Sequence, residues 1–532
     1  MIEEKIGKGL IFIALLFSLI IIISNIIGFF WLNSIIILVV SFIGAVLLSK
    51  FIPKIKVDNK LFGLMILLVI MLSYPVIFIT PGFTAGADAV STTMIRLLNG
   101  HIPLDHAQYG GLNLSYQLGF PLVANVFTEI APIMPDYLWP WALVVFAGAL
   151  QLFFIYLFSK EFFKSEKAGF VSAILFFGGK LVYENVYNGE FAWVMATAFM
   201  FLFLYLFLKK NRLQYIVFPV VFVTHPAVGF NLLVFFIIHF IFYKTKIKEV
   251  VKILSSLILV IPLIIMSYFP IAYNMLFNKD TISEGFAFGF WKAILALPPW
   301  IGNAIVIAFV LLLIVSIWKR TLLKEKEQNF LFTLLIVSTV MFILFSFIGF
   351  VLAGRIVELM FITILLLSAS FFTKIELSKK KIAILLILFL LTSLFFFTTS
   401  SILNHYRNSN KNDLENIKFA VAFYEFDSSQ ERVLFLSQGG GGKIGEYSNK
   451  IPFNLKSAHM ILLRDFSYYP NEAFYEFKSN TATWEKIFYE NSIELVDNIN
   501  VKYIVVNKND FKTELNYPIV FEYAKFIVYK KY

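Results

Sequence analysis

Several ionisable residues stand at the ends of apolar segments, where a membrane protein could bring them to one surface. Five of them carry most of the chemistry that the sequence offers: Asp88, Glu184, Glu190, His225 and Arg355. A carboxylate or an imidazole can act as a general base toward an acceptor hydroxyl, and a guanidinium can stabilise an anionic phosphate that leaves. Because ionisable groups beside lipid are costly, such a set favours a functional site if its members share one face of the membrane.

Each of these residues also has a purely structural interpretation. Asp88 can cap a helix over 89–99, the two glutamates can be solvated loop acids, and His225 can be a turn residue. Arg355 can pair with Glu358 three residues further on. The functional interpretation therefore depends on the residues lying together, and the elements that hold them decide whether they do.

The composition indicates that these elements are membrane spans. The chain has 532 residues, of which 59% are hydrophobic and only 15% charged, and its mean hydropathy is +0.79. A span needs about 20 apolar residues. The apolar runs predict an α-helical polytopic protein with about thirteen spans over 1–400: 9–30, 34–52, 61–80, 138–159, 168–183, 191–208, 213–224, 227–243, 251–272, 299–318, 329–351, 355–373 and 381–400. The segment 213–224 is too short to cross alone, and Thr224-His225-Pro226 beyond it can be either a hairpin tip or a kink. The distribution of cations along the chain requires that 213–243 crosses twice or not at all.

The distribution of Lys and Arg predicts the orientation. If the segments alternate, 24 of the 29 cations in 1–400 fall on the side of the N-terminus. Cationic loops stay in the cytoplasm, so we expect a multi-pass cell-membrane protein with a cytoplasmic N-terminus and residues 401–532 outside. The net charge of +11 has this topological origin and indicates no nucleic-acid partner. Six tryptophans fall at the predicted outer boundary, as in an aromatic belt: Trp31, Trp139, Trp141, Trp193, Trp291 and Trp300.

The outer loop 81–137 is the most informative segment. It contains 57 residues and a single cation, Arg96, and loops of this length are usually functional. Residues 89–99 have an apolar helical face that predicts a helix on the membrane surface. Asp88 precedes this helix, so we expect its carboxylate at the outer interface, where with Glu184 or Glu190 it could hold a divalent cation. The sequence contains no cysteine, which excludes Cys-based metal sites.

Residues 401–532 are predicted to form a small extracytoplasmic α/β domain. We expect a helix over 411–424, a strand over 433–436, a helix over 482–491, a strand over 503–506 and a hairpin over 518–530. The predicted boundary between the membrane domain and this domain lies at residue 400.

Three motifs in the outer loop are similar to a known signature. They are Gly86-Ala-Asp88, Asn99-Gly-His-Ile-Pro103 and Leu114-Ser-Tyr116-Gln-Leu-Gly119-Phe-Pro121. Together with the many spans and the outer C-terminal domain, they resemble archaeal and bacterial members of the GT-C superfamily of polytopic glycosyltransferases, many of them of unassigned activity. Ala89 stands where many members carry a second acidic residue, and the C-terminal domain lacks the WWD-type motif of oligosaccharyltransferases, which disfavours that subgroup.

The resemblance implies transfer of a sugar from a polyprenyl-phosphate donor to an acceptor on the outer membrane face. In that reaction Asp88 would be the general base and Arg355 would stabilise the departing phosphate. The other predicted substrate-binding residues are Arg96, Glu184, Glu190, His225 and Tyr116. The cofactor stays unknown, with a divalent cation as the candidate, and the expected partners are membrane lipid and the lipid-linked donor.

Two alternatives stay open at this stage. Thirteen spans also fit a transporter or lipid flippase, although no acidic residue lies near the midpoint of a predicted span, where coupling-ion sites usually lie. A non-catalytic assembly protein that acts through residues 401–532 is the other alternative. Fold-level resemblance alone does not distinguish these functions.

Overall fold

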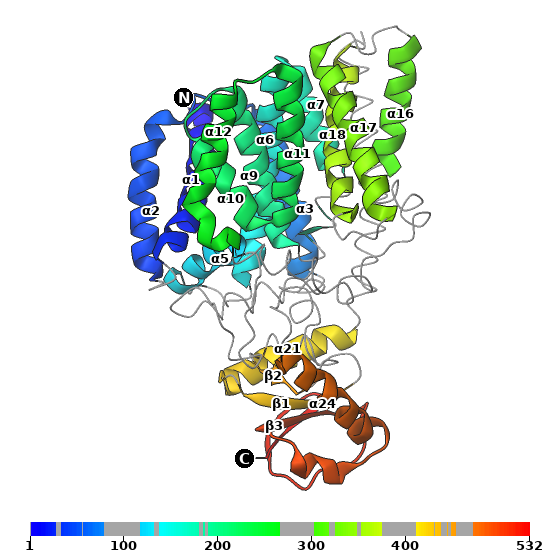
Figure 1. Ribbon diagram of the computed structural model, residues 1–532. Coiled ribbons are helices and arrows are strands. Elements are labelled where there is room, and N and C mark those ends of the chain that lie inside the picture. Colours follow the sequence, from blue (N-terminus) through cyan, green and yellow to red (C-terminus); the bar gives the residue numbers. More distant parts are fainter. Residues whose placement is uncertain are drawn as a thin grey trace.

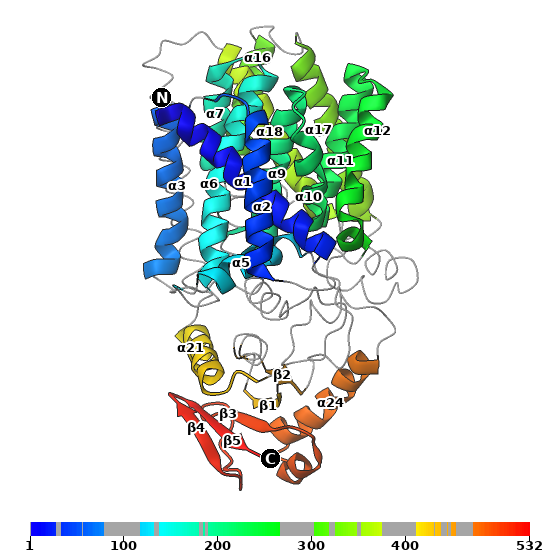
Figure 2. The same ribbon diagram turned by 90° about the vertical axis from the view of Figure 1, so that its left-hand side faces the viewer.

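The protein consists of a helical bundle and a smaller domain with a β-sheet at one end of it (Figure 1). The computed structural model describes residues 2–27, 33–55, 57–78, 118–131, 133, 138–179, 183, 185–186, 190–265, 303–318, 325–347, 353–374, 411–429, 431–437, 444, 448, 450–453 and 472–531. The N-terminus lies at the end of the bundle that faces away from the small domain, and the C-terminus lies in that domain (Figures 1 and 2).

The described part of the bundle contains thirteen α-helices and two short 3-10 helices. They are α1 (Ile2–Ile27), α2 (Ser34–Leu48), η1 (Ser49–Phe51), α3 (Asn59–Phe78), α5 (Gly119–Ile130), α6 (Leu138–Phe162), α7 (Glu166–Phe177), α9 (Phe191–Leu208), α10 (Gln214–Thr224), α11 (Pro226–Tyr243), α12 (Ile247–Ser255), η3 (Ser256–Val260), α16 (Asn303–Trp318), α17 (Lys326–Phe347) and α18 (Ala353–Lys374). Each of the first twelve predicted spans overlaps one of these helices, and 381–400 lies outside the described residues. Seven described helices are long and apolar enough to cross a membrane. The polytopic helical fold is confirmed, whereas the number of thirteen spans stays a prediction.

The helices differ greatly in how much of their surface the protein covers. The apolar stretches of α6, α9 and α18 are 89%, 89% and 94% buried, whereas that of α2 is only 22% buried. On α2 large apolar side chains such as Ile35, Val39 and Ile43 are at least half exposed. A soluble protein rarely exposes so much contiguous apolar surface. The exposed face of α2 is therefore a lipid-facing surface, and α6, α9 and α18 form the centre of the bundle.

Residues 214–243 form a helical hairpin. α10 ends at Thr224, His225 is extended with φ −155° and ψ 113°, and α11 begins at Pro226. Proline suits the first helical position because its missing N–H has no helical partner there. The two helices lie side by side (Figure 1) and pack closely, since a Cβ on Gly229 would lie 2.7 Å from the Phe222 ring. The segment Thr224-His225-Pro226 is therefore a hairpin tip and not a kink.

One helix falls inside the segment predicted as an outer loop. α5 begins at Gly119, and its first eight residues are buried. A Cβ on Gly119 would lie 2.6 Å from Oγ1 of Thr224 and 2.7 Å from its Cα, so only glycine allows α5 to pack against the hairpin tip. The sequence analysis did not predict this helix within the segment 81–137, and the assignment of 81–137 as an outer loop stays a prediction. The surface helix predicted over 89–99 lies outside the described residues.

The small domain is built on a five-stranded mixed sheet with strand order β2-β1-β3-β5-β4. Its elements are α21 (Lys411–Phe426), β1 (Arg432–Leu436), β2 (Ile451–Pro452), α24 (Glu472–Tyr489), η5 (Ile493–Asn498), β3 (Tyr503–Asn507), β4 (Ile519–Tyr523) and β5 (Phe526–Lys530). β1 pairs in parallel with β2 and β3, whereas β5 pairs antiparallel with β3 and β4. The predicted helix over 411–424, both strands and the final hairpin are confirmed. β2 was not predicted, and α24 begins ten residues before the predicted helix.

The sheet of the small domain has an apolar core on each face. Val433 and Phe435 of β1 pack with Phe419 and Phe423 of α21. Leu434 and Leu436, which alternate with them, pack in a second cluster with Trp484 of α24. Successive side chains of a strand point to opposite faces, so the sheet is covered by one helix on each side.

Candidate functional site

Arg355 and Glu190 meet where two central helices begin. Arg355 lies in the first turn of α18, and Glu190 is the residue that precedes α9. Nη2 of Arg355 lies 3.0 Å from Oε1 of Glu190, across 165 positions of sequence. Both helices begin at the end of the bundle that faces the small domain (Figure 1). The structure therefore brings two of the predicted site residues into direct contact at one end of the bundle.

A second carboxylate holds the same guanidinium from inside the protein. Oε1 of Glu358, one turn along α18, lies 3.1 Å from Nη1 of Arg355. The other oxygen, Oε2, accepts a hydrogen bond from the indole N–H of Trp193. Trp193 is only 1% exposed, and the Glu358 side chain is 6% exposed. A buried carboxylate persists only when its oxygens are paired, so these two donors fix Glu358 in place.

The two carboxylates have different accessibility. The side chains of Arg355 and Glu190 are 32% and 29% exposed, against 6% for Glu358. An exposed ion pair contributes about 0–1 kcal/mol and can be exchanged for another anion. A buried pair is costly to break because it leaves an unpaired charge. Glu358 therefore orients the guanidinium, and Glu190 occupies the side that an external anion could take.

The hairpin of α10 and α11 supports this cluster from a third direction. Asn231 of α11 donates its Nδ2 hydrogen bond to the backbone oxygen of Arg355 at 2.9 Å, which anchors the first turn of α18. His225 at the hairpin tip is 4% exposed, and its Nδ1 accepts a bond from the backbone N–H of Val228 at 3.4 Å. His225 thus lies in the turn between the two helices, as its structural interpretation predicts, and it also caps α11.

The other predicted site residues cannot be placed relative to this cluster. Asp88, Arg96, Tyr116 and Glu184 lie outside the described residues. Within the part of the chain that the structure describes, no group of three or more His, Asp or Glu residues could hold a metal ion. The predicted cation site, which requires Asp88, therefore stays a prediction.

The sequence did not predict the contact between Trp193 and Glu358. For Glu358 it predicted only the ion pair with Arg355. Trp193 was predicted in an interfacial aromatic belt, but the structure buries it, because α9 is at the centre of the bundle. Trp141 is likewise 7% exposed. The spacing of Arg355 and Glu358 predicted their ion pair, which is confirmed. Glu358 is an acidic residue inside an otherwise apolar run, and this was the sequence feature that could have indicated a larger polar cluster.

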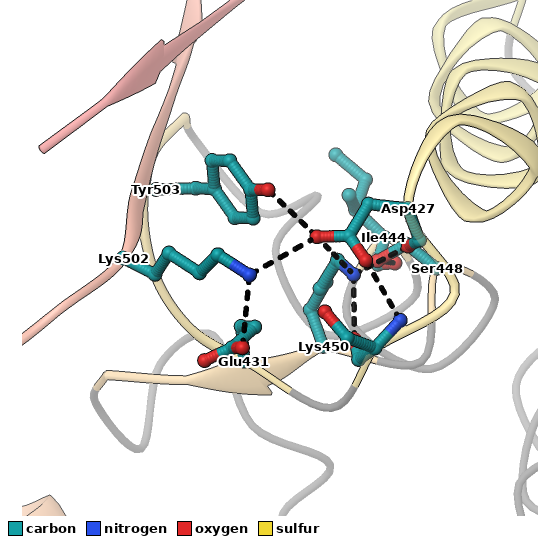
Figure 3. A network of polar contacts seen from close by, with 8 residues as sticks. Asp427, Glu431, Ile444, Ser448, Lys450, Lys502 and Tyr503 are labelled. Atoms are coloured by element: carbon teal, nitrogen blue, oxygen red, sulfur yellow. Dashed lines mark hydrogen bonds and ion pairs between the residues drawn. The ribbon is translucent and has the colours of Figure 1, made fainter. Parts of the chain in front are cut away.

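A separate polar network in the small domain has a structural explanation (Figure 3). The buried Nζ of Lys450 donates to the backbone oxygens of Asp427 and Ser429, at 2.5 and 2.6 Å, just past the end of α21. The Asp427 carboxylate also accepts a bond from the Tyr503 hydroxyl at 2.7 Å and lies 3.6 Å from Nζ of Lys502. Basic groups commonly satisfy the last carbonyls of a helix. Burial lowers the pKa of Lys450 to about 8. The network holds the connection between α21 and β1 in place.

The Arg355 cluster lies in the part of the chain that matches the model of a known protein family. A model of the EpsG family matches residues 138–411, which include α6 to α18 and all members of the cluster. No curated protein matches the chain. The crystal structure of ArnT from Cupriavidus metallidurans bound to undecaprenyl phosphate is similar in fold, with a TM-score of 0.55 and 9% sequence identity. The similarity covers 89% of this chain and 98% of that one. At this identity the likeness concerns the fold alone.

Proposed function

This chain belongs to the EpsG family, and on that premise we propose that it is a GT-C-like membrane glycosyltransferase, as its fold similarity to ArnT suggests, which transfers a sugar from a polyprenyl-phosphate donor to an acceptor. The reaction takes place at the end of the bundle that faces the small domain. The undecaprenyl phosphate bound to the structurally similar ArnT supports a lipid phosphate as the leaving group.

The observation that carries the proposal is the Arg355 cluster at the mouth of an apolar bundle. A polyprenyl-phosphate donor has a long apolar chain and a charged head, so it needs an apolar surface that ends at a cation. Arg355 offers a partly exposed guanidinium held by Glu358, at the end of the apolar bundle where α9 and α18 begin. Guanidinium groups bind phosphate oxygens through charge-assisted hydrogen bonds.

In the proposed mechanism Glu190 gives up its contact with Arg355 when the donor phosphate binds. Glu358 keeps its bond to Nη1 and holds the guanidinium in the same orientation. Nη2, which lies 3.0 Å from Glu190 in the free protein, then contacts a phosphate oxygen. As the bond between the anomeric carbon and this phosphate breaks, the phosphate takes the electron pair, and Arg355 stabilises the negative charge that develops.

The acceptor is activated by Asp88. Its carboxylate takes the proton of the acceptor hydroxyl while the acceptor oxygen forms the new bond to the anomeric carbon. This role rests on the resemblance of Gly86-Ala-Asp88 to the GT-C first loop, because residue 88 lies outside the matched range 138–411. Glu184, Tyr116 and His225 are proposed to contact the sugar or the acceptor, and Arg96 is the second candidate for phosphate binding.

We propose that this end of the molecule is extracytoplasmic. The opposite end carries the N-terminus, and a cavity there groups Glu3 with Lys160 and Lys209. These lysines belong to the cation-rich loops that stay in the cytoplasm of multi-pass proteins. The small domain would then cover the site from outside the cell.

The test is a transfer assay with the full-length protein in detergent. Wild type, Asp88→Asn and the loop control Asp105→Asn are incubated with radiolabelled polyprenyl-phosphate sugars and a native membrane extract. We expect label transfer by wild type and by Asp105→Asn, and a loss of about 10²- to 10⁴-fold in Asp88→Asn, the usual contribution of a general base. Full activity of Asp88→Asn would contradict its role. Absence of label transfer by all three proteins, together with no retention of the labelled donor on the purified protein, would favour a transporter or an assembly protein.

A further inference from the structure

A second site is built into the opposite end of the bundle. A cavity of about 810 Å³ lies where the first turn of α1, the segment 54–60, the last turns of α6 and α9, and the start of α7 come together. Figure 2 shows the N-terminus beside the beginning of α3 at this end. Small-molecule sites in proteins typically have volumes of about 300–1,000 Å³, so the cavity is large enough for a ligand that the proposed glycosyl transfer does not use.

The segment that forms one wall of the cavity is held at both ends. The backbone N–H of Val57 donates to the oxygen of Glu3 at 3.3 Å, and Ile55 crosses α1 where a Cβ on Gly7 would lie 2.7 Å from its backbone oxygen. At the other end Asn211 donates its side-chain N–H to the backbone oxygen of Phe51 at 2.8 Å. The wall is therefore anchored to α1 and to the α9–α10 connection, and the cavity is formed before any ligand binds.

The wall formed by α6, α7 and α9 is the inner wall of the cavity. Its charged side chains form ion pairs with one another. Nζ of Lys160 lies 2.7 Å from Glu166, and Nζ of Lys209 lies 2.5 Å from Glu161. These two pairs join α6 to α7 and to α9. Because both lysines and both glutamates are paired, neither an ammonium group nor a carboxylate of these pairs is left to bind a ligand on that wall.

The outer wall, formed by the first turn of α1 and the segment 54–60, carries charges that are not paired in this way. Lys54 and Lys60 bring two cations, and Glu3 and Asp58 bring two carboxylates, all of them lining the cavity. Among the described residues none of these four forms an ion pair, although one Asp58 oxygen accepts the backbone N–H of Lys60 at 2.7 Å. Glu4, which also lines the cavity, is paired with Lys8 at 3.4 Å. The two cations and two carboxylates that remain suit a ligand that itself carries both signs. An anionic ligand alone would face two carboxylates.

The apolar surface next to this wall indicates where the ligand comes from. α3 begins at Asn59, inside the cavity lining, and its side chains Phe62, Ile66 and Ile70 are 39%, 46% and 57% exposed. Residues four apart lie on one face of a helix. This exposed stripe runs from the cavity toward the middle of the membrane, which is the path that a lipid chain would follow.

We propose that the cavity binds the headgroup of a zwitterionic phospholipid from the leaflet at this end of the bundle. The phosphodiester contacts the ammonium groups of Lys54 and Lys60, the headgroup ammonium contacts Glu3 and Asp58, and an acyl chain lies along the exposed face of α3. The bound lipid links α1 to α3 beside the α6–α9 pair. This site is independent of the glycosyl-transfer site, which lies at the other end of the same helices.

The test measures lipid retention by native mass spectrometry of the full-length protein in detergent. The probes are phosphatidylethanolamine, phosphatidylglycerol, which has the phosphodiester but no ammonium group, and glycerophosphoethanolamine, which has the headgroup but no acyl chains. Lys54→Gln/Lys60→Gln removes the proposed phosphate contacts. Lys246→Gln/Lys248→Gln, at the same end but outside the cavity, is the matched control. Thermal unfolding of each variant confirms that it is folded.

We expect wild type and the control to bind phosphatidylethanolamine about tenfold more tightly than phosphatidylglycerol. Lys54→Gln/Lys60→Gln should lose about tenfold in affinity for both lipids, and Glu3→Gln/Asp58→Asn should lose the preference for phosphatidylethanolamine. Equal binding of both lipids by wild type, or unchanged binding by Lys54→Gln/Lys60→Gln, would overturn the proposal. Equally tight binding of glycerophosphoethanolamine would reject a lipid as the source of the headgroup.

Discussion

Glu190 is the residue whose replacement best separates the proposed mechanism from a purely structural ion pair. If Glu190 occupies the place of the donor phosphate, Glu190→Gln should bind a polyprenyl phosphate more tightly than wild type. If Glu190 instead holds Arg355 in position, the same change should weaken binding. The two interpretations therefore predict opposite signs for one measurement.

The expected size follows from the geometry. Glu190 lies 3.0 Å from Nη2 of Arg355, so a phosphate on that nitrogen would bring its charge to about 5 Å from the carboxylate. Coulomb repulsion at that distance is about 0.8 kcal/mol in water and about 3 kcal/mol at an effective dielectric constant of 20. Glu190 is 29% exposed, so we expect a value near the lower limit. Loss of the exposed ion pair adds about 0.2–1 kcal/mol. The sum corresponds to roughly tenfold tighter binding.

Arg355→Gln should have the opposite effect. It removes charge-assisted hydrogen bonds worth about 1.5–3 kcal/mol, which weakens binding by roughly ten- to a hundredfold. It also leaves the buried Glu358 with the Trp193 N–H as its remaining side-chain donor among the described residues. The double variant Arg355→Gln/Glu358→Gln, which leaves no unpaired charge at the buried position 358, separates loss of binding from loss of folding.

The assay is equilibrium binding of a fluorescent polyprenyl phosphate to purified wild type, Glu190→Gln, Arg355→Gln and the double variant. Because Glu190 is partly exposed, the gain in Glu190→Gln should shrink as salt rises from 0.05 to about 0.5 M. Weaker binding by Glu190→Gln would refute the idea that this carboxylate occupies the phosphate position. Unchanged binding by all variants would exclude Arg355 as the phosphate ligand.

Two further predictions concern the fold. Gly119→Ala should destabilise the protein by about 1–3 kcal/mol, because the added Cβ would lie 2.6 Å from Thr224. The control is Gly63→Ala, whose new Cβ meets no atom of a neighbouring residue within 4 Å. Equal thermal unfolding temperatures of the two variants would contradict the predicted contact. In the small domain Lys450 has a pKa of about 8 against an ordinary 10.5, so the unfolded state binds more protons in that window and stability should rise by about 2 kcal/mol between pH 8 and 10. Above pH 10 the rise should be offset by Tyr503, because burial and its hydrogen-bonded carboxylate partner raise the pKa of this phenol to about 12. Hydrogen exchange of β1 and β3 in the full-length protein, compared with Lys450→Met at each pH, measures both effects, and parallel pH profiles of the two proteins would contradict this assignment.

The sequence predicted the helices well because their signal is local. Runs such as 191–208 are apolar along their whole length, and lipid requires an apolar run to form a helix whose backbone bonds are internal. The strand at Tyr503–Asn507 was equally clear because all five of its side chains are buried. β2 has only two residues and depends on pairing with Arg432 and Val433 of β1. Such a strand has no periodicity that a sequence could display.

The site was predicted only in part, because burial within a bundle depends on neighbours. Trp193 and the lipid-facing residues of α2 belong to equally apolar segments, and hydropathy does not distinguish a helix surrounded by protein from one surrounded by lipid. Glu358 could be paired with Arg355 from their spacing, but the contact with Glu190 joins residues 165 positions apart. The long-range contacts of the described cluster thus come from packing and not from any local pattern.

The position of this cluster on the helices has a physical reason. α9 and α18 are among the most buried helices of the bundle, and the residues where they begin are in direct contact. A group that stabilises a developing charge must already point at it, because reorientation during the reaction would cost part of the stabilisation. Arg355 begins α18, and the buried Glu358 and Asn231 hold its side chain and its backbone. Only the contact with Glu190 is exposed, so the rigid centre fixes the cation and leaves one replaceable partner where a donor phosphate can bind.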